Sequence, residues 1–481
     1  MKEEFDKLAP GPVLALIYTH THPDHLLAAS VFHEEGRPII AGSRAPESLD
    51  EQFASFAPTL RRRGAQQFGE GLARADLRPS GIGPALSVDP GPVPPILYPT
   101  RTVKGREVFP IGGTALMIQE APGETRDQIF VYLPERGVLL PGDNIYKAFP
   151  NLYAPRGVPP RPVREWIASL DIMRGLGPEY LVPSHTEPVA GKRNVDEILT
   201  AYRDAIAFVH DSVIRKANEA MDLEDMVEAI ELPPHLKNHP WLAETYGKVS
   251  WSVRGIHEGY LGWFDGNATR LDPTHPRERA ERLVALAGGR EKILAEARAA
   301  QERGDAQWAA ELCDELLALN ADDPEARAAK ADALEKLGRE TGNANARHFY
   351  LTSALDLRGE YKGPGKPEID DGTVRDLPIG VIIRSFPERL DPKKTADIVK
   401  TIGFTMTDTG ETFTFIIRRG VGEVRDERAE SPDLSFSATE SDFKSFLIGT
   451  LSPAVALAGG RVKFSGGLDE LIAFKSYLIQ P

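Results

Sequence analysis

Apolar and polar residues alternate in short blocks over the first 190 residues, a pattern that predicts buried strands ending in polar loops. The first apolar block, VLALIY at 13–18, stops at a group of histidines, and apolar residues with helical spacing follow at 24–35. Further strand-length blocks lie at 38–42, 115–121, 128–134, 137–143 and 179–185. We therefore expect a layered α/β domain with its functional site on loops at strand ends.

Long helical periodicity replaces this alternation from about residue 193. Residues 288–338 predict paired helices, and their sequence resembles a tetratricopeptide-type hairpin. About one such unit is visible, so we do not expect a solenoid. Because helix pairs with apolar faces need a partner, we expect two chains to form a homodimer; packing against the first domain is the alternative.

The last part of the chain predicts mixed structure. Residues 413–425 predict strand–turn–strand, and 434–451 predict a strand followed by a helix with Thr439 as its N-cap. The Pro/Gly-rich stretch 361–372 predicts a linker. The expected organisation is an α/β domain (1–190), a helical domain (191–345), a linker (346–369) and an α+β domain (370–481).

Composition narrows the class of protein. The chain has 481 residues, of which 41% are hydrophobic and 27% charged, as in globular proteins of about three domains. No apolar run of about 18 residues predicts a membrane span. The N-terminus MKEEFDKLAP has no signal-peptide pattern, so we expect a cytoplasmic protein. A net charge of −14 argues against a general nucleic-acid binder.

The histidine group suggests metal chemistry. His20, His22, Asp24 and His25 form the pattern His-x-His-x-Asp-His directly after a predicted strand. The single Cys313 excludes an intramolecular disulfide and a cysteine metal cluster, so any metal site uses His, Asp and Glu. A loop of this pattern can direct side chains to two metal ions that share one hydroxide. Imidazole and carboxylate ligands suit zinc, with manganese or iron as alternatives.

One loop cannot complete two coordination spheres, so further ligands must come from later in the chain. Glu124, Asp143 and His185 follow three of the predicted strands and are the candidates. Taken singly, each residue is as well explained by an ordinary turn or a solvated loop. Their order after the histidine group favours one shared metal site.

These motifs resemble the metallo-β-lactamase superfamily. Glu124 stands in Pro-Gly-Glu-Thr where that superfamily usually has Pro-Gly-His-Thr, which is typical of its branch of alkylsulfatases that cleave dodecyl sulfate. YLGWFDGN at 260–267 resembles the signature of the branch's dimerisation domain, and the last ~110 residues resemble its sterol-carrier-like C-terminal domain. The resemblance implies an αββα sandwich, a helical dimerisation domain and an α+β domain.

The resemblance also implies roles for individual residues. His20, His22 and Glu124 would hold one zinc ion, Asp24, His25 and His185 a second, and Asp143 would bridge them. Asn151 and Arg156, in NLYAPRG, would hold the sulfate, with a structural salt bridge as the alternative for Arg156. Tyr260 would reach the site from the helical domain or else serve as a core aromatic.

The expected function is zinc-dependent hydrolysis of linear alkyl sulfate esters to an alcohol and inorganic sulfate. One alternative is another hydrolysis on the same two-metal centre. A second is a dimeric surfactant- or lipid-binding protein without catalysis. For the C-terminal domain there are two alternatives: an apolar tunnel that binds an alkyl tail, or a scaffold with a filled core.

Two features depart from the resemblance. Trp251 stands where the family tends to have His, which would alter substrate preference or leaving-group protonation. The family also has a long region before the metal loop, so the sandwich is expected to be N-terminally incomplete, and the block 13–18 to lie at an open sheet edge. A signal peptide in such a region would make the protein periplasmic or secreted.

Overall fold

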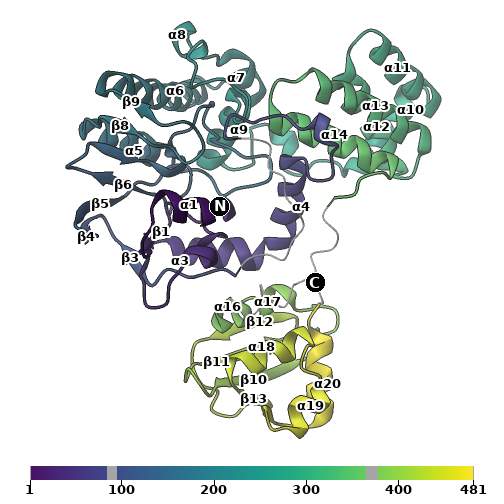
Figure 1. Cartoon of the computed structure of the whole chain (residues 1–481). Coiled ribbons are helices and arrows are strands. Elements are labelled where there is room, and N and C mark those ends of the chain that lie inside the picture. Colours follow the sequence, from purple (N-terminus) through teal and green to yellow (C-terminus); the bar gives the residue numbers. More distant parts are fainter. Residues whose placement is uncertain (1, 84–94, 364–376, 480–481) are drawn as a thin grey trace.

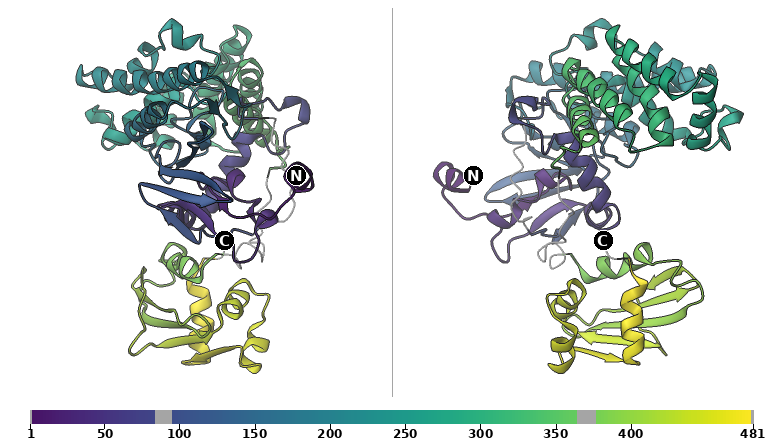
Figure 2. Two further views of the ribbon diagram at one scale, coloured as in Figure 1. Left: turned by 60° about the vertical axis from the view of Figure 1, so that its left-hand side comes forward. Right: turned by 90° about the vertical axis from the view of Figure 1, so that its right-hand side faces the viewer.

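The computed structural model describes residues 2–83, 95–363 and 377–479. Figure 1 shows an α/β part built from the first half of the chain, a helical part beside it and a smaller α/β part at the C-terminus. The C-terminal part lies at the opposite side of the first α/β part from the helices α10–α13, as Figure 2 also shows.

Two sheets form the centre of the first part. Within the described residues, one sheet has the order β1-β2-β3 with parallel pairing, and the other has the order β4 to β9. The strands are β1 (Leu16–Ile17), β2 (Ile39–Gly42), β3 (Arg101–Val103), β4 (Arg106–Ile111), β5 (Thr114–Glu120), β6 (Ile129–Leu133), β7 (Val138–Leu140), β8 (Tyr180–Leu181) and β9 (Val189–Ala190). The block 13–18 therefore supplies only a two-residue strand, at the edge of its sheet.

Helices cover the outer faces of both sheets. The first sheet carries α2 (Ala29–Phe32) and α3 (Ala45–Asp50), with α1 (Lys2–Leu8) and α4 (Ala57–Phe68) nearby. The second sheet carries α5 (Val163–Gly175) and α6 (Lys192–Asn218). The predicted helix at 24–35 is shorter than expected, because Pro23–His25 form a separate 3-10 turn before α2.

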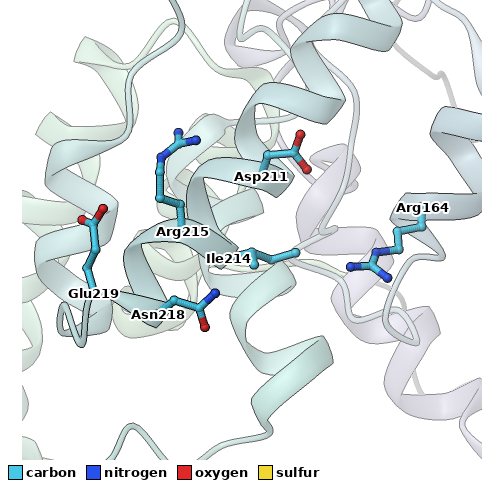
Figure 3. A pocket seen from close by; sticks show the side chains of 6 residues that line it. All are labelled: Arg164, Asp211, Ile214, Arg215, Asn218 and Glu219. Carbon is cyan, nitrogen blue, oxygen red and sulfur yellow. The ribbon is translucent and has the colours of Figure 1, made fainter.

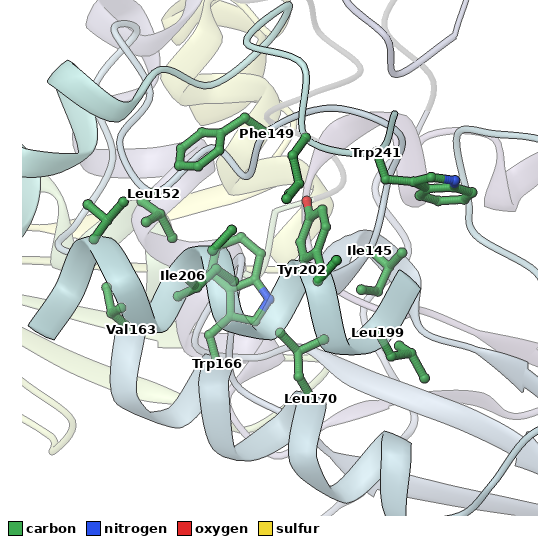
Figure 4. Close-up of a cluster of buried hydrophobic side chains, with 14 of the residues drawn as sticks. Ile145, Phe149, Leu152, Val163, Trp166, Leu170, Leu199, Tyr202, Ile206 and Trp241 are labelled. Carbon is green, nitrogen blue, oxygen red and sulfur yellow. The ribbon is translucent and has the colours of Figure 1, made fainter. Parts of the chain in front are cut away.

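Strand β6 shows how the layers are fixed by the sequence. Ile129 and Val131 join the core between the two sheets, whereas Phe130 and Tyr132 join the core beneath α5 and α6. This two-residue alternation is what a strand buried on both faces requires. Figure 4 shows the second core, in which Trp166 is fully buried between α5 and α6. The predicted αββα sandwich is confirmed.

The helical part contains the predicted helix pairs. Its helices are α7 (Leu223–Ala229), α8 (Pro234–Lys237), α9 (Val249–Leu261), α10 (Pro276–Leu286), α11 (Arg290–Glu302), α12 (Ala306–Leu319), α13 (Pro324–Glu340) and α14 (Ala344–Arg358). Helices α11, α12 and α13 pack as consecutive hairpins around Leu294, Leu316 and Ala326. None of the helices in the described ranges is long and apolar enough to cross a membrane.

Two expected boundaries do not coincide with the packing of the helices. A boundary at 190/191 would cut α6 away from α5, yet both helices share one core through Leu170 and Leu199. The expected linker 346–369 begins inside α14, which runs to Arg358 and buries Leu351 and Ala354. Of the Pro/Gly-rich stretch, residues 361–363 have no regular structure, and 364–372 lie outside the described residues.

The C-terminal part is an α+β domain. Its sheet has the order β12-β11-β10-β13-β14. The strands are β10 (Val399–Met406), β11 (Thr412–Arg418), β12 (Val421–Arg425), β13 (Leu434–Ala438) and β14 (Val462–Ser465); the helices are α16 (Ile379–Arg384), α17 (Phe386–Arg389), α18 (Glu440–Ile448), α19 (Pro453–Ala458) and α20 (Leu468–Tyr477). Thr439 is the N-cap of α18, as predicted, because its side chain accepts a hydrogen bond from Asp442 N–H.

Phenylalanine rings pack the interior of this domain. Phe404 lies 5.5 Å from Phe436 and 5.4 Å from Phe443, measured between ring centroids, and all three rings are buried. Such ring pairs add to the stability that burial alone supplies. The packing agrees with the filled-core alternative for this domain.

Candidate metal centre

The structure brings all seven predicted ligand residues together. The histidine group follows β1, and the other three residues lie in the loops after β5, β7 and β8. The residues form two groups: His20, His22, Glu124 and Asp143 in one, and Asp24, His25 and His185 in the other. Within each group, one possible ligand atom of every residue lies within 4.8 Å of the others.

The first group has the spacing of ligands around a single ion. His20 Nε2 lies 2.9 Å from His22 Nδ1 and 3.6 Å from Glu124 Oε2. The distance from His22 Nδ1 to Glu124 Oε2 is 3.2 Å. Zinc binds such atoms at about 2.0–2.2 Å, which places tetrahedral ligands roughly 3.3–3.6 Å apart. The ring nitrogens of His20 and His22 and the Glu124 oxygen therefore lie close enough together to bind one metal ion.

The second group has the same spacing and shares a carboxylate with the first. His25 Nε2 and His185 Nε2 lie 3.1 Å apart, and each is 3.4 Å from Asp24 Oδ2. Asp143 Oδ2 is 3.1 Å from His185 Nε2 and 3.3 Å from His25 Nε2. The same oxygen is 3.9 Å from His20 Nε2 in the first group. Asp143 thus lies between the two groups, where a bridging ligand would be.

The carboxylates make this cluster attractive to cations. Burial would lower the pKa of His25 and of His185, but Asp143 and Asp24 outweigh it and raise both to about 10. Burial would likewise raise the pKa of Asp143, but the charge and hydrogen bonds of His25 and His185 hold it well below its usual range. A negative potential that retains protons on imidazole nitrogens also favours a metal ion at the same place.

Asn144 ties two of the ligand loops together. Its Oδ1 accepts a hydrogen bond from Glu124 N–H at 3.0 Å, and its Nδ2 donates to the carbonyl of Ala121 at 2.8 Å. Helix α5 holds both loops from outside, because Trp166 Nε1 donates to the Asn144 carbonyl at 3.2 Å. A Cβ at Gly123 would collide with Asn144 Oδ1, so only glycine permits this close approach.

Polar groups suited to an anion lie beside the cluster. Arg156 Nη2 is 2.9 Å from His22 Nε2. The side chain of Arg161 is 3% exposed, and its Nη2 lies 3.5 Å from Glu124 Oε1. Neither Arg161 Nε nor either side-chain atom of the fully buried Asn151 has a hydrogen-bond partner within the described part of the chain. Burial lowers the pKa of Arg156 from its ordinary value.

The helical part helps to place Asn151. The backbone N–H of Asn151 donates to Tyr146 Oη at 2.6 Å, and the Tyr146 ring packs against Tyr246 of the helical part with centroids 5.6 Å apart. Just before Asn151, Phe149 N–H donates to the carbonyl of Ala243 at 2.8 Å. The sequence did not predict Arg161 or Tyr246 as site residues. The only sequence signal for Arg161 was its place five residues after Arg156.

Tyr260 contacts residues other than the seven candidate ligands. Its hydroxyl pairs with His210 Nε2 at 2.9 Å, and His210 Nδ1 pairs with Asp211 Oδ1 at 2.7 Å. Arg164 lies over the Tyr260 ring. A surface hollow on this side of α6 is lined by Arg164, Asp211, Ile214, Arg215, Asn218 and Glu219, as Figure 3 shows. The role of Tyr260 in substrate binding stays a prediction.

Comparison with known proteins accounts for the chain part by part. Residues 2–185 match the model of the metallo-beta-lactamase superfamily, 222–360 that of alkyl sulfatase dimerisation, and 368–481 that of the alkyl sulfatase C-terminal domain. A linear primary-alkylsulfatase from a Pseudomonas species (strain ATCC 19151) is 34% identical over 490 residues, covering 98% of this chain and 92% of the relative. This chain belongs to the alkylsulfatases. The family resemblance stated from the sequence is thereby confirmed.

Other alkylsulfatases extend the comparison. An (R)-specific secondary-alkylsulfatase from Pseudomonas is 29% identical over 96% of this chain and 72% of its own length. The solved structure of a stereoselective inverting sec-alkylsulfatase from Pseudomonas covers all of this chain and 78% of its own, with a TM-score of 0.90 and 27% identity. This alkylsulfatase chain therefore has the fold of its family throughout its described length.

Proposed function

We propose that this alkylsulfatase hydrolyses linear alkyl sulfate esters to an alcohol and inorganic sulfate, using two zinc ions held by the seven clustered residues. The observation that carries the proposal is the convergence of two ligand groups on Asp143. His20, His22 and Glu124 would hold one ion, and Asp24, His25 and His185 the other, with Asp143 between them. Manganese or iron are the alternatives that such ligands permit.

The fit between the residues and metal ions rests on their donor atoms. Ligand-type atoms of His20, His22 and Glu124 face each other at 2.9–3.6 Å, and Glu124 Oε2 has no hydrogen-bond partner inside the described ranges. A buried carboxylate oxygen without a donor is costly, and a cation would satisfy it. When bound, metal ions at these positions supply Lewis acidity and a water that is nucleophilic near neutral pH.

The sulfate is proposed to lie against Asn151, Arg156 and Arg161. The Arg161 side chain is buried and Arg156 is partly buried beside the cluster, and among the described residues the ionic partner of Arg161 is the Glu124 carboxylate, at 3.5 Å. Guanidinium groups donate paired hydrogen bonds to oxyanions, and a buried site strengthens them. Asn151 adds an amide whose Nδ2 has no hydrogen-bond partner among the described residues. These groups would orient the ester and stabilise charge that develops on the sulfate.

The contact between Arg156 and His22 supports an anion-binding role for Arg156. A guanidinium can only donate, so His22 Nε2 accepts in the structure described here. A neutral imidazole that binds a metal through Nδ1 carries its proton on Nε2 and cannot accept. The Arg156 guanidinium then needs another acceptor, which an oxygen of the sulfate ester supplies.

Dimer formation is proposed through the end of α9 and the segment after it. Tyr260, Leu261 and Trp263 are 51%, 59% and 70% exposed, and all belong to one short segment. The segment lies within residues 222–360, which match the alkyl sulfatase dimerisation model. Exposed apolar side chains grouped in this way are typical of protein–protein contacts.

The test of the proposed function is sulfate release from dodecyl sulfate by zinc-loaded protein. We expect turnover by the wild type and a loss of at least about 100-fold in His22→Ala, because removing a ligand disrupts the metal site. His235→Ala, an exposed histidine on α8, is the matched control and is expected to retain activity. Equal activity of His22→Ala and wild type would contradict the proposed site, and no sulfate release by the metal-loaded wild type would contradict the proposed reaction.

A further inference from the structure

The loop that carries Arg156 is held by helix α4, a contact that the local sequence pattern did not predict. Gln67 Oε1 accepts a hydrogen bond from the backbone N–H of Arg156 at 3.0 Å. One turn earlier on the same helix, Arg63 Nη2 donates to the carbonyl of Pro155 at 2.7 Å. Two consecutive residues of the loop are therefore fixed from one helix face.

The burial of Gln67 indicates that its hydrogen bond to Arg156 is a specific contribution of the amide side chain. Gln67 is fully buried, and its Nε2 has no hydrogen-bond partner among the residues that the structure describes. A buried amide that satisfies only half of its hydrogen-bonding capacity costs stability, and an apolar side chain of similar size would avoid that cost. The bond from Oε1 to Arg156 is the specific contribution that an apolar residue could not make.

Helix α4 is held in turn by α14 of the helical part. His348 Nδ1 lies 3.0 Å from the Gln67 carbonyl, and its Nε2 accepts a hydrogen bond from Arg78 N–H at 3.1 Å. At the end of α4, Gly69 has φ of +72°, and a Cβ there would lie 3.1 Å from His348 Cγ. A continuous path of contacts thus runs from α14 through α4 to Arg156.

We propose that Gln67 is a positioning residue for Arg156 and that His348 supports it from the helical part. The inference rests on the proposed function in one respect, namely that Arg156 binds the sulfate. A flexible arginine side chain can reach an anion from many backbone positions, but it binds well only if little conformational freedom remains to be lost. The hydrogen bond to the backbone N–H of Arg156 fixes the position from which its side chain extends. Because His348 of the helical part holds α4 in turn, the helical part contributes to anion affinity without contacting the anion.

The experiment measures inorganic sulfate binding to the zinc-loaded full-length protein, by calorimetry and as competitive inhibition of dodecyl sulfate hydrolysis. Gln67→Met removes the acceptor at similar side-chain length, and Gln67→Glu keeps an acceptor oxygen. Gln66→Met is the matched control, because Gln66 is the neighbouring residue on α4 and no hydrogen bond of its side chain is found in the described residues. Arg156→Met defines the full loss of the anion contact.

We expect Gln67→Met to weaken sulfate binding by about 3–10-fold and to raise KM by a similar factor, the effect of one lost hydrogen bond. Zinc content and kcat are expected to change by less than about 3-fold, while Gln67→Glu and Gln66→Met bind sulfate within about 2–3-fold of wild type. A fall in Tm with unchanged sulfate affinity in Gln67→Met would overturn the proposal and leave Gln67 a purely structural residue.

Failure of the proposed function gives a different result. If the wild type binds sulfate through Arg156 but releases none from dodecyl sulfate, the proposed reaction fails and the calorimetric comparison still decides the role of Gln67. If the wild type binds no sulfate, or Arg156→Met binds it as tightly as wild type, Arg156 has no anion to position and the inference is overturned as well.

Discussion

At the scale of single residues, the candidate site depends on side chains that hold the ligands as well as on the ligands. Asn144 follows Asp143 in the sequence and bonds the main chain at Glu124 and Ala121. One amide therefore sets the distance between the loop after β5 and the loop after β7. Supporting residues of this kind commonly change metal affinity by about 10–100-fold when they are replaced.

Replacement of Asn144 is expected to loosen the metal centre. In Asn144→Leu both hydrogen bonds are lost, and we expect zinc affinity to fall by about 10–100-fold, measured by competition with a chelator. Asn144→Asp keeps the acceptor for Glu124 N–H but loses the donor to Ala121, so an intermediate loss is expected. Asn218→Leu, on the exposed face of α6, is the control. Unchanged zinc affinity in Asn144→Leu would show that the loops hold their positions without this bond.

At the scale of elements, strands with strong apolar patterns were predicted, and the more polar strands at sheet edges were not. The blocks at 38–42, 115–121 and 128–134 became β2, β5 and β6, because burial on both faces gives a strand a continuous apolar sequence. Strand β4 was missed, since its exposed residues alternate with half-buried ones at the sheet edge. Helix α14 was assigned in part to a linker, because its contacts with α4 and α13 come from distant parts of the chain.

The contact between α14 and α4 predicts a pH dependence of stability. Burial lowers the pKa of His348 from its ordinary value of 6.5, and the neutral ring accepts the Arg78 N–H. The unfolded chain then takes up the proton first, so the stabilisation by His348 is complete above about pH 6.5 and is lost as the pH falls below it.

The measurement is the free energy of unfolding of wild type and His348→Leu between pH 7.5 and 5, from denaturant titrations. We expect the wild type to be the more stable at pH 7.5 and the difference to narrow as the pH falls, because other titrating groups contribute equally to both proteins. A difference that stays constant, or that widens toward pH 5, would mean that His348 is not neutral in the folded protein.

At the scale of the whole molecule, two of the three parts build the candidate site. The first α/β part supplies the candidate ligands, and residues 243–247 and α14 of the helical part hold the loops that carry Asn151 and Arg156. The C-terminal part contacts the first part on another side, where Ser55 Oγ donates to Glu388 Oε1 at 2.8 Å. The helical part therefore has a structural connection to the loops of Asn151 and Arg156 in addition to any role in association.

The proposed dimer predicts a mass and an interface. Light scattering at micromolar concentration is expected to give twice the 52.7 kDa of one chain. Trp263→Asp is expected to shift the protein toward the monomer, because a charge would be buried in the apolar contact. Trp308→Asp is the matched control, since Trp308 is also an exposed tryptophan of the helical part, on α12. A monomeric wild type would refute the dimer, and dissociation by Trp308→Asp alone would move the interface to α12.

The sequence by itself determined the fold class and the seven candidate ligands. Alternating apolar blocks define buried strands, and polar residues directly after them must lie at strand ends, so His20, Asp143 and His185 could be assigned from local pattern and family resemblance. Their chemistry follows from residue type, since only imidazole and carboxylate groups were available.

Only the tertiary structure decided which side chains lie against the ligand loops and the loop of Arg156. Gln67, Arg161 and Asn144 are polar residues in segments whose local pattern predicts nothing unusual, and their function depends on burial and on partners up to hundreds of residues away. Tyr260, for which the family resemblance implied a role at the site, pairs with His210 in the fold, and its role in substrate binding stays a prediction. Such contacts are set by how layers and loops pack, which a local pattern of apolar and polar residues does not encode.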